Sequence, residues 1–371
     1  MWKYKSLKLA NFGKPANLTD LTKLANLEKL ASSVSLAALL ASFNSLAGFI
    51  LPATAEPSMP IVSAESIVIE RAARGNTKRP RVALVLGGGG LRGAAHVGIL
   101  RVLEREGIPI DMVVGTSMGA IVGGLYCAGV GTEQLEKELV HRFISTYYSA
   151  PLAVQAVKMN ISCLLLRKPQ GLYDGRNLAR CIDRHVPAQQ REISNLRPQF
   201  AAVTTDLIEG RTQVLTNGDL GKALQASTAI PFLRRPVVLG DALLVDGGAI
   251  CNLPVDQAKK LGADFIIAVD VNEKIEKTER NQLHRKIVKI SSRVLALMLA
   301  KIDEEQKDGA DICIQPNVTG ISLLSRKVSD GERALVAGED AAQKALPELK
   351  MKLMMAGIDL NDDEHLVSVQ R

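Results

Sequence analysis

The segment Gly115-Thr116-Ser117-Met118-Gly119 could present a nucleophilic hydroxyl. It follows the short apolar run Met112–Val114, which is typical of a buried strand, and precedes the apolar stretch Ala120–Ala128, which predicts a helix. Between a strand and a helix, glycines on both sides of a serine allow a sharp turn that exposes its Oγ at the carboxyl edge of a sheet. A helix cap is the alternative role for Ser117.

A serine nucleophile needs a base, and Asp246 is the candidate. This residue follows the apolar run Ala242–Val245 and precedes Gly247 and Gly248, which permit a close approach to another backbone. A carboxylate held against apolar neighbours is a stronger base than one in water. A structural turn is the alternative role for Asp246.

Four consecutive glycines, Gly87 to Gly90, follow the apolar run Arg81–Leu86 and precede a helical pattern. Their amides can point into one concavity at the start of a helix, which makes an anion site. Arg92 adds positive charge beside this site. A plain tight turn is the alternative, although such a turn needs one or two glycines rather than four.

The same glycines also match the G-x-G-x-x-G spacing of a dinucleotide site, through Gly88, Gly90 and Gly93. That site needs an acidic residue after the second strand to hold the ribose. Asp111 precedes its strand, and Gly115 occupies the position after it. Nucleotide binding therefore stays as an alternative to an anion site for catalysis.

Histidine and cysteine spacing argues against other chemistries. An α/β-hydrolase would require a later histidine, but His284 lies in a charged helical stretch and His365 in a polar tail. The histidines form no pattern such as H-E-x-x-H, so we expect no metal and no cofactor. The five cysteines are scattered without C-x-x-C spacing, which predicts reduced cysteines in the core.

The first 55 residues have the features of a targeting segment. Six lysines precede an uncharged stretch from Leu30 to Ala55, which ends in Ala53-Thr54-Ala55. This pattern predicts a secretory signal cleaved after Ala55, and hence an exported or membrane-associated protein. An uncleaved anchor over Leu30–Leu51 and a helix that packs on the body are the alternatives. The scattered cysteines leave a cytoplasmic location open.

Composition excludes several classes of protein. The chain is 47% hydrophobic and 23% charged, as is usual for a globular protein, which excludes disorder and a coiled coil. Its formal charge is +7, but the residues after 55 carry 40 basic and 37 acidic side chains. Such a mild balance, with 4% aromatic residues, predicts no nucleic-acid partner.

A strand, a glycine-rich turn and a helix occur twice in succession, which predicts a parallel sheet covered by helices. Further strand patterns occupy 200–204, 213–216, 237–239, 242–245 and 265–269. We expect a signal or anchor over 1–55, a linker over 56–80, a catalytic core over 81–271 and a helical C-terminal extension over 272–371 that packs on the core.

Two segments could serve substrate entry. The apolar, irregular region 144–173 is either a lid or acyl-chain channel or part of the core. Residues 281–307 predict a long helix with an apolar stripe and with cations around it; the stripe contains Leu283, Ile287, Ile290, Val294 and Leu297. We expect this stripe to pack against the sheet, and contact with an anionic membrane surface is the alternative.

Three ordered motifs, Gly88-Gly89-Gly90-Leu91-Arg92-Gly93, the serine pentad and Asp246-Gly247-Gly248, resemble the patatin-like phospholipase domain. Bacterial members and the esterase domain of neuropathy target esterase are the most similar type. The segment Ala226–Pro231 also resembles a family segment, and the resemblance covers about Arg81 to Val271. It implies an α/β fold, a three-layer α/β/α sandwich with a mainly parallel central sheet.

The resemblance also implies a mechanism. Ser117 would be the nucleophile and Asp246 the general base of a Ser–Asp dyad that cleaves lipid acyl esters, phospholipid or lysophospholipid among them. The backbone amides of three glycines, with Arg92, would form the oxyanion hole; the three are Gly88, Gly89 and Gly90. The remaining motif glycines would support the turns, namely Gly93, Gly115, Gly119, Gly247 and Gly248.

One departure and two alternatives accompany the resemblance. Some members have an aspartate ahead of the three glycines, where this chain has Gly87, so any role of that acid is absent. His96 falls on the following helix and is expected to pack or hydrogen-bond, since a dyad needs no imidazole. The partners of a hydrolase of this kind would be a lipid ester and a membrane surface. The alternatives to a hydrolase are a nucleotide-binding protein and an inactive scaffold.

Overall fold

The computed structural model describes residues 79–142, 176–231, 233–279, 287–323 and 325–360. The predicted signal or anchor, most of the predicted linker, the candidate lid over 144–173 and the two late histidines, His284 and His365, lie outside these residues. Within them, no helix is both long enough and apolar enough to cross a bilayer.

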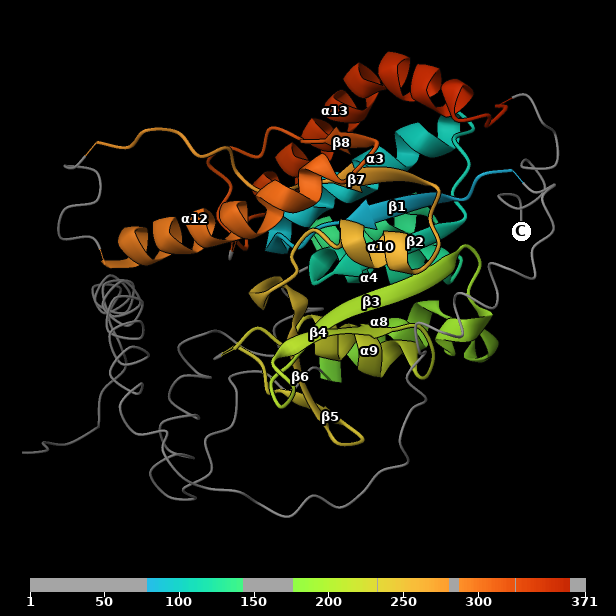
Figure 1. The fold of residues 1–371 in the computed structure, drawn as a ribbon. Coiled ribbons are helices and arrows are strands. Elements are labelled where there is room, and N and C mark those ends of the chain that lie inside the picture. The colour runs from blue at the N-terminus through green and yellow to red at the C-terminus, as the bar shows by residue number, and fades with distance from the viewer. Residues whose placement is uncertain (1–78, 143–175, 232, 280–286, 324, 361–371) are drawn as a thin grey trace, which may run out of the picture. The chain divides into compact units, whose positions relative to one another are not determined.

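One eight-stranded sheet forms the centre of the fold (Figure 1). Its order is β5-β6-β3-β2-β1-β7-β8, and β4 also pairs with β3. The strands β3, β2, β1, β7 and β8 run parallel to one another, whereas β4, β5 and β6 are joined by antiparallel pairs. The strand bounds are β1 Val82–Leu86, β2 Met112–Thr116, β3 Gln199–Asp206, β4 Arg211–Leu215, β5 Val237–Leu239, β6 Ala242–Asp246, β7 Phe265–Val269 and β8 Ile312–Ile314.

Helices connect the strands. The α-helices are α3 Ala94–Arg105, α4 Met118–Cys127, α5 Thr132–Glu136, α8 Arg176–His185, α9 Leu220–Ser227, α10 Val255–Lys260, α12 Ile287–Asp308 and α13 Val328–Met355. Short 3-10 turns lie at η2 Gly90–Gly93, η4 Ala188–Gln190, η5 Ile193–Asn195 and η6 Gly247–Ala249, and η3 Lys137–His141 is a π-helical turn.

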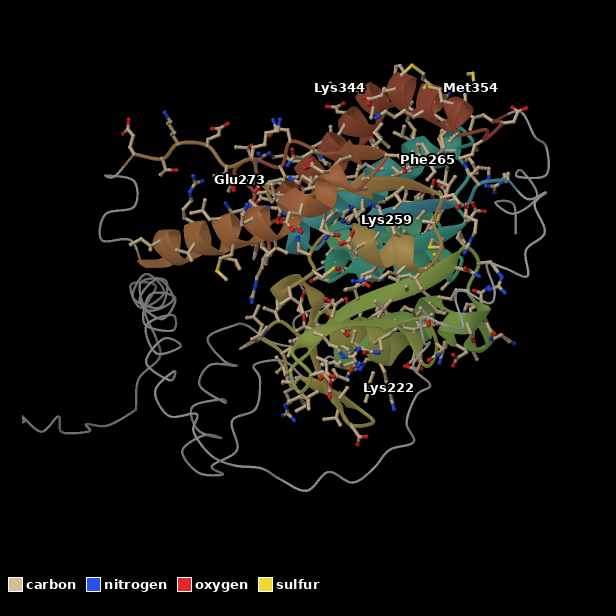
Figure 2. The ribbon with its side chains drawn as sticks, in the orientation of Figure 1. Lys222, Lys259, Phe265, Glu273, Lys344 and Met354 are labelled. Carbon is tan, nitrogen blue, oxygen red and sulfur yellow. The ribbon has the colours of Figure 1, made fainter. Side chains whose placement is uncertain are left out.

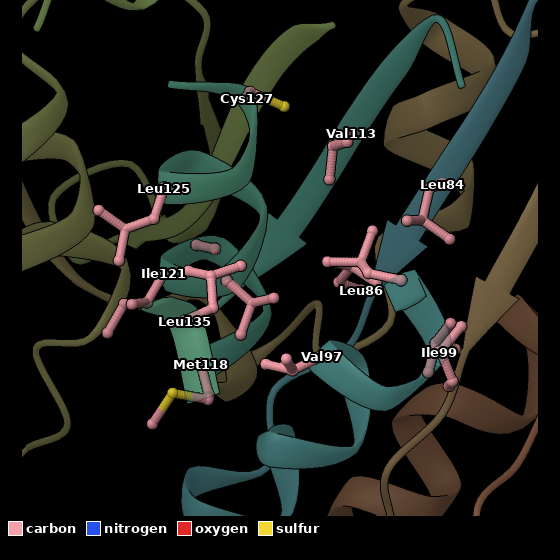
Figure 3. Packing of buried hydrophobic residues seen from close by; sticks show 14 of the residues in the cluster. Leu84, Leu86, Val97, Ile99, Val113, Met118, Ile121, Leu125, Cys127 and Leu135 are labelled. Atoms are coloured by element: carbon pink, nitrogen blue, oxygen red, sulfur yellow. The ribbon is translucent and has the colours of Figure 1, made fainter. Parts of the chain in front are cut away.

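Side chains of each central strand alternate between two cores on opposite faces of the sheet. In β1, Leu84 and Leu86 enter the larger core together with residues of α3 and α4, whereas Ala83 and Val85 enter the smaller core together with residues of α10. Figure 3 shows part of the larger core, where Ile99 lies near Leu84 and Leu86. The predicted fold class is therefore confirmed, since helices cover both faces of a mainly parallel sheet.

The C-terminal part differs from the helical extension that the sequence predicted. The strand β8 pairs with β7, with Ile312 opposite Ile267, so the sheet continues beyond Val271. Its run of Ile312-Cys313-Ile314 is too short to give a strand pattern on its own. The helix α13 then packs on α3, so this part of the chain contributes both a strand and a helix to the layers.

The predicted packing of the long helix against the sheet is also wrong for much of its length. The apolar residues Ile290, Val294 and Leu297 of α12 are exposed, whereas Leu299 and Asp303 face inward. The buried side chains thus lie near the carboxyl end of α12, and the stripe that predicted burial lies on another face. Sequence periodicity locates such a stripe but does not say whether another element covers it.

A tight crossing joins α3 and α13, and we predict that it tolerates no side chain at Gly338. A Cβ there would lie 2.1 Å from the Ala95 carbonyl oxygen. Replacing Gly338 by Ala should lower the free energy of unfolding by about 1–3 kcal/mol, although Ala is the better helix former. Urea unfolding measures the effect, and Gly131→Ala is the control, because nothing lies within 4 Å of a Cβ at Gly131. Equal stability of the Gly338→Ala variant and the wild type would show that the helices are not in close contact.

The described cysteines agree with the sequence prediction. Cys127, Cys181, Cys251 and Cys313 are free, and three of them are buried. Core cysteines of this kind act as small apolar side chains.

Candidate active site

The turn between β2 and α4 holds Ser117 in a strained conformation. Its φ is 54° and its ψ is −120°, and among the described residues it is the one non-glycine residue with positive φ. The turn requires both flanking glycines, because a Cβ at Gly115 would lie 2.5 Å from the Gly119 carbonyl oxygen and one at Gly119 would lie 2.1 Å from that of Leu86. Strain of this kind is found at functional sites, where the surrounding packing maintains it.

The Ser117 hydroxyl points at Asp246. Its Oγ donates a hydrogen bond of 2.6 Å to Oδ2 of Asp246, and both residues are 7% exposed. Sheet register makes this possible, because β3 pairs Val203 with Thr116 on one side and Thr204 with Asp246 on the other. The structure thus brings together the two residues that the sequence selected as nucleophile and base.

The environment of Asp246 suits a base. Burial raises the pKa of its carboxyl group to about 6, while the hydrogen bonds from Ser117 and Gly248 and the charge of Arg234 oppose the shift. A carboxyl group of this pKa is mostly ionised at neutral pH, and it is a stronger base than an exposed aspartate.

The glycine loop lies directly beside Ser117. A Cβ at Gly88 would be 3.1 Å from the Ser117 Cβ. The Gly88 amide, however, donates to the Asn252 carbonyl oxygen at 3.2 Å, so the prediction that it points at an oxyanion is wrong for this conformation. Within the described residues, the amides of Gly89 and Gly90 have no hydrogen-bond acceptor. These two amides therefore remain candidates for the oxyanion donors.

The motif glycines behind the site mark close approaches of backbone and side chains. A Cβ would meet another atom within 3.1 Å at each of them, and these positions are Gly93, Gly115, Gly119, Gly247 and Gly248. The order of the three motifs in the sequence thus corresponds to one packed site in space.

Comparison with known proteins matches the pattern of the patatin-like phospholipase family to residues 84–259. Residues 84–259 are thus similar to a patatin-like phospholipase domain. The patatin-like phospholipase domain-containing protein 6 of Mus musculus is 33% identical over 210 residues, which are 56% of this chain and 14% of that protein. Lysophospholipase nte1 of Neurospora crassa is 37% identical over 194 residues, which are 51% of this chain and 12% of that protein.

This chain thus spans about one seventh or less of the length of these curated relatives. Among solved structures, VipD from Legionella pneumophila aligns with 73% of this chain and 67% of its own, at 13% identity and a TM-score of 0.43.

Arg92 of the patatin-like domain does not line the oxyanion site through its side chain, contrary to the sequence prediction. Its Nη2 donates to Glu273 at 2.9 Å and its Nε to the Ile321 carbonyl oxygen at 2.5 Å. Figure 2 shows Glu273 on the chain that follows β7. A buried guanidinium needs such partners, and here it ties the glycine loop to two later segments.

Sequence reasoning missed the residues that hold the loop in the patatin-like domain. Asn252 forms two hydrogen bonds with Gly88. Its backbone carbonyl oxygen accepts from the Gly88 amide, and its side-chain Nδ2 donates to the Gly88 carbonyl oxygen at 3.4 Å. The same Nδ2 donates to Asp303 at 2.7 Å, and Asp303 also accepts from the Leu253 amide and from Asn272. Burial raises the pKa of Asp303 to about 6, and these three hydrogen bonds oppose the shift. Asp303 lies on α12, far from the motifs, so no sequence signal marked it.

Ser227 and Arg234 were missed as well. The Ser227 Oγ accepts from the Ser117 amide at 2.9 Å and donates to the Val203 carbonyl oxygen at 2.7 Å, so it holds the nucleophile turn to β3. The buried Arg234 donates a hydrogen bond to Thr228 at 2.8 Å, and its positive charge lowers the pKa of Asp246. Ser227 belongs to the segment Ala226–Pro231, which resembles a segment of the patatin-like family, and this resemblance could have indicated its role.

The described histidines do not contact the side chains of Ser117 and Asp246 through hydrogen bonds. In the described part of the patatin-like domain, none is hydrogen-bonded to Ser117 or Asp246. His96 donates from Nε2 to the Gly87 carbonyl oxygen at 2.8 Å, and burial lowers its pKa to about 4, so it stays neutral. The structure thus places it as a support of the glycine loop.

The dinucleotide alternative gains no support from this geometry. The strand β2 ends at Thr116 and is followed by Ser117, where a dinucleotide site would need an acidic residue for the ribose. Gly88 of the loop instead lies beside the Ser117 side chain.

One group outside the site has metal-binding residue types. Side-chain atoms of Glu138, Cys181 and His185 lie within 4.8 Å of one another. Glu138 is buried and already accepts from His185 at 3.1 Å and from Arg142 at 3.0 Å. The group is therefore explained as a buried ion-pair network that joins η3 to α8.

Proposed function

We propose that the chain is a serine acyl hydrolase that cleaves lipid acyl esters, with phospholipid or lysophospholipid as substrate. The observation that carries this proposal is the hydrogen bond of 2.6 Å from the Ser117 Oγ to the buried Asp246, in a strained turn beside the glycine loop. The names of the relatives, a lysophospholipase among them, support the same substrate class.

The reaction would proceed in two steps. In the first, Ser117 Oγ attacks the ester carbonyl carbon while Asp246 takes the hydroxyl proton, and the proton then passes to the leaving alcohol. In the second, Asp246 takes a proton from water, which attacks the acyl-enzyme carbonyl carbon. The bond to Ser117 Oγ then breaks, Asp246 returns the proton to this Oγ, and the fatty acid is released. The strained turn holds the hydroxyl in place for the attack before substrate arrives.

Negative charge develops on the carbonyl oxygen in both steps. The amides of Gly89 and Gly90 are the donors that can meet it, and each such donor typically contributes about 10²–10³ in rate. We assign no donor role to the Gly88 amide or to the Arg92 guanidinium, because both have partners elsewhere.

A screen of lipid classes tests the proposal. Purified protein is incubated with diacyl phospholipid, lysophospholipid and triacylglycerol, and the released fatty acid is measured by mass spectrometry. Fatty-acid release from at least one phospholipid class is expected, with none from the Ser117→Ala variant. Release by neither protein, or by both, would contradict the proposal.

We also propose that the N-terminal segment is an export signal. N-terminal sequencing of the mature protein tests cleavage after Ala55.

The pH dependence follows from the base. Asp246 must be ionised to accept a proton, so kcat/KM on a soluble ester should rise with pH through about 6 and level off above it. Arg234 lowers the pKa of Asp246, so Arg234→Met should move the midpoint to higher pH. Arg235→Met is the matched control, since this neighbouring arginine is exposed. An unchanged midpoint in the Arg234→Met variant, or a shift to lower pH, would show that Asp246 is not the titrating base.

A further inference from the structure

The helix α12 presents an apolar face to solvent. Five of its large apolar side chains are between 39% and 56% exposed, and these are Ile290, Val294, Leu295, Leu297 and Met298. Ile290, Val294 and Met298 follow one another at intervals of four residues, so they lie along one face, with Leu297 beside them. Figure 1 shows α12 extending away from the sheet on the side to which β1 points. A continuous exposed apolar face of this kind marks an interaction surface.

The charge on this part of the chain is one-sided. Between residues 281 and 302 there are five basic residues and no acidic residue, and the acidic residues of α12 begin after this stretch, at Asp303, Glu304 and Glu305. The segment before it, 273–280, is balanced, with three acidic and three basic residues. Lys301, whose side chain is 76% exposed, follows Leu297 by four residues and forms an exposed ion pair of 2.7 Å with Glu304. Of these cations, Arg293 and Lys301 have side chains that the structure describes. Apolar side chains and cations on one helix match a membrane surface, where hydrocarbon lies beneath negative charge.

The inner end of the same helix reaches the candidate active site. Asp303 accepts from Asn252, which binds Gly88 of the glycine loop, and Gly88 lies beside Ser117. The exposed Met298 is five residues from Asp303, or about 7.5 Å along a helix. The exposed face therefore begins close to the place where an ester would be cleaved.

Two further apolar side chains border the site itself. Ile250, 44% exposed, follows the turn after Asp246, and Ile230, 36% exposed, follows Ala229, whose carbonyl accepts from the Asp246 amide. These two exposed side chains give the surface beside Asp246 an apolar character of its own.

We propose that the exposed face of α12 docks on a bilayer that contains anionic phospholipid and so brings the patatin-like domain to its substrate. This inference rests on the proposed function for the choice of lipid over a protein partner. Cations provide attraction to the head groups, and the apolar side chains enter the boundary between head groups and acyl chains. A soluble ester needs no such docking, so only hydrolysis of vesicle lipid depends on this face.

A local fluorescence measurement tests the docking, whatever the N-terminal segment does. Trp2 is the single tryptophan of the chain, so a Trp2→Phe background with Met298→Trp reports on α12 alone. We expect a blue shift with vesicles of phosphatidylcholine and phosphatidylglycerol, and loss of emission when their acyl chains carry bromine. The control is Met354→Trp in the same background, because Met354 is exposed on α13 (Figure 2). Emission from the control should not change.

A charge variant tests the consequence for hydrolysis. Val294→Asp should weaken vesicle binding and hydrolysis of vesicle lipid about tenfold. Fluorophosphonate labelling of Ser117 and hydrolysis of a soluble ester should stay at wild-type levels, which also shows that the variant folds. Failure of labelling in the wild type would contradict the proposed function, whereas the fluorescence result judges the docking separately.

Several results would overturn the docking proposal. One is an unchanged emission of the Met298→Trp variant with bromine-labelled vesicles, and another is equal quenching of the Met354→Trp variant. Equal binding to vesicles of phosphatidylcholine alone would contradict the role of the cations. A loss of self-association in the Val294→Asp variant, measured by light scattering, would show that this face joins two copies of the chain.

Discussion

Replacing Ser117 by Ala should reduce ester hydrolysis by about 10⁶-fold, the size expected when the nucleophile of a serine hydrolase is removed. The fall is large because no other described hydroxyl has both a buried carboxylate as acceptor and free amides beside it. The strained backbone of this turn gives the hydroxyl its position, and Ala leaves the backbone unchanged. Release of fatty acid from the preferred lipid, compared with the wild type, measures the effect.

The control for this variant is Ser194→Ala, because Ser194 is exposed in a surface turn. Its activity should equal that of the wild type. Hydrolysis by Ser117→Ala within about tenfold of the wild type would mean that another group attacks the ester, since loss of a covalent nucleophile has a far larger effect.

Replacing Asp246 by Asn should reduce turnover by about 10³–10⁴-fold, the range expected for loss of a general base. The amide has the size of the carboxylate but cannot accept the Ser117 proton in the reaction. Binding of substrate should change little, since the apolar surroundings and the glycine loop are the same. Steady-state kinetics on a soluble ester should therefore show the loss in kcat rather than in KM.

Asp241→Asn is the matched control, because Asp241 lies exposed in the turn between β5 and β6. It should retain full turnover. A dyad also predicts that His96→Gln keeps most of the activity, because the hydrogen bond of its imidazole goes to the Gly87 carbonyl oxygen and not to Ser117 or Asp246. A loss of 10³-fold or more in that variant would instead indicate a histidine base.

Local patterns predicted much of this fold. The alternation of short apolar runs with glycine turns and helices placed β1, β2 and α4 close to their actual bounds, and it predicted a parallel sheet covered by helices. The three-layer arrangement was implied by the family resemblance. These elements are predictable because they are short-range: burial on both faces selects apolar runs, and glycine selects the turns.

Long-range relations were not predictable in the same way. The strand β6 runs antiparallel to β3, and only this register places Asp246 beside Ser117, which is 129 positions away. The sequence shows that Asp246 ends a strand, but it does not show which strand lies next to it. The proximity of the two residues was therefore a hypothesis drawn from their chemistry.

The oxyanion site shows a second limit. Glycine spacing predicted amides at the start of a helix, yet the Gly88 amide is bound by Asn252 and the Arg92 guanidinium by Glu273. Both partners come from other segments, and no local pattern indicates them. The apolar stripe of α12 is a similar case, since exposure depends on what the rest of the chain covers.

The most direct test of the central claim is to locate the adduct formed with a fluorophosphonate. The labelled protein is digested, and mass spectrometry identifies the modified residue. We predict a single adduct on the peptide that contains Ser117, no adduct in the Ser117→Ala variant and much slower labelling of Asp246→Asn. Equal labelling of the wild type and Ser117→Ala, or an adduct on another residue, would contradict the account.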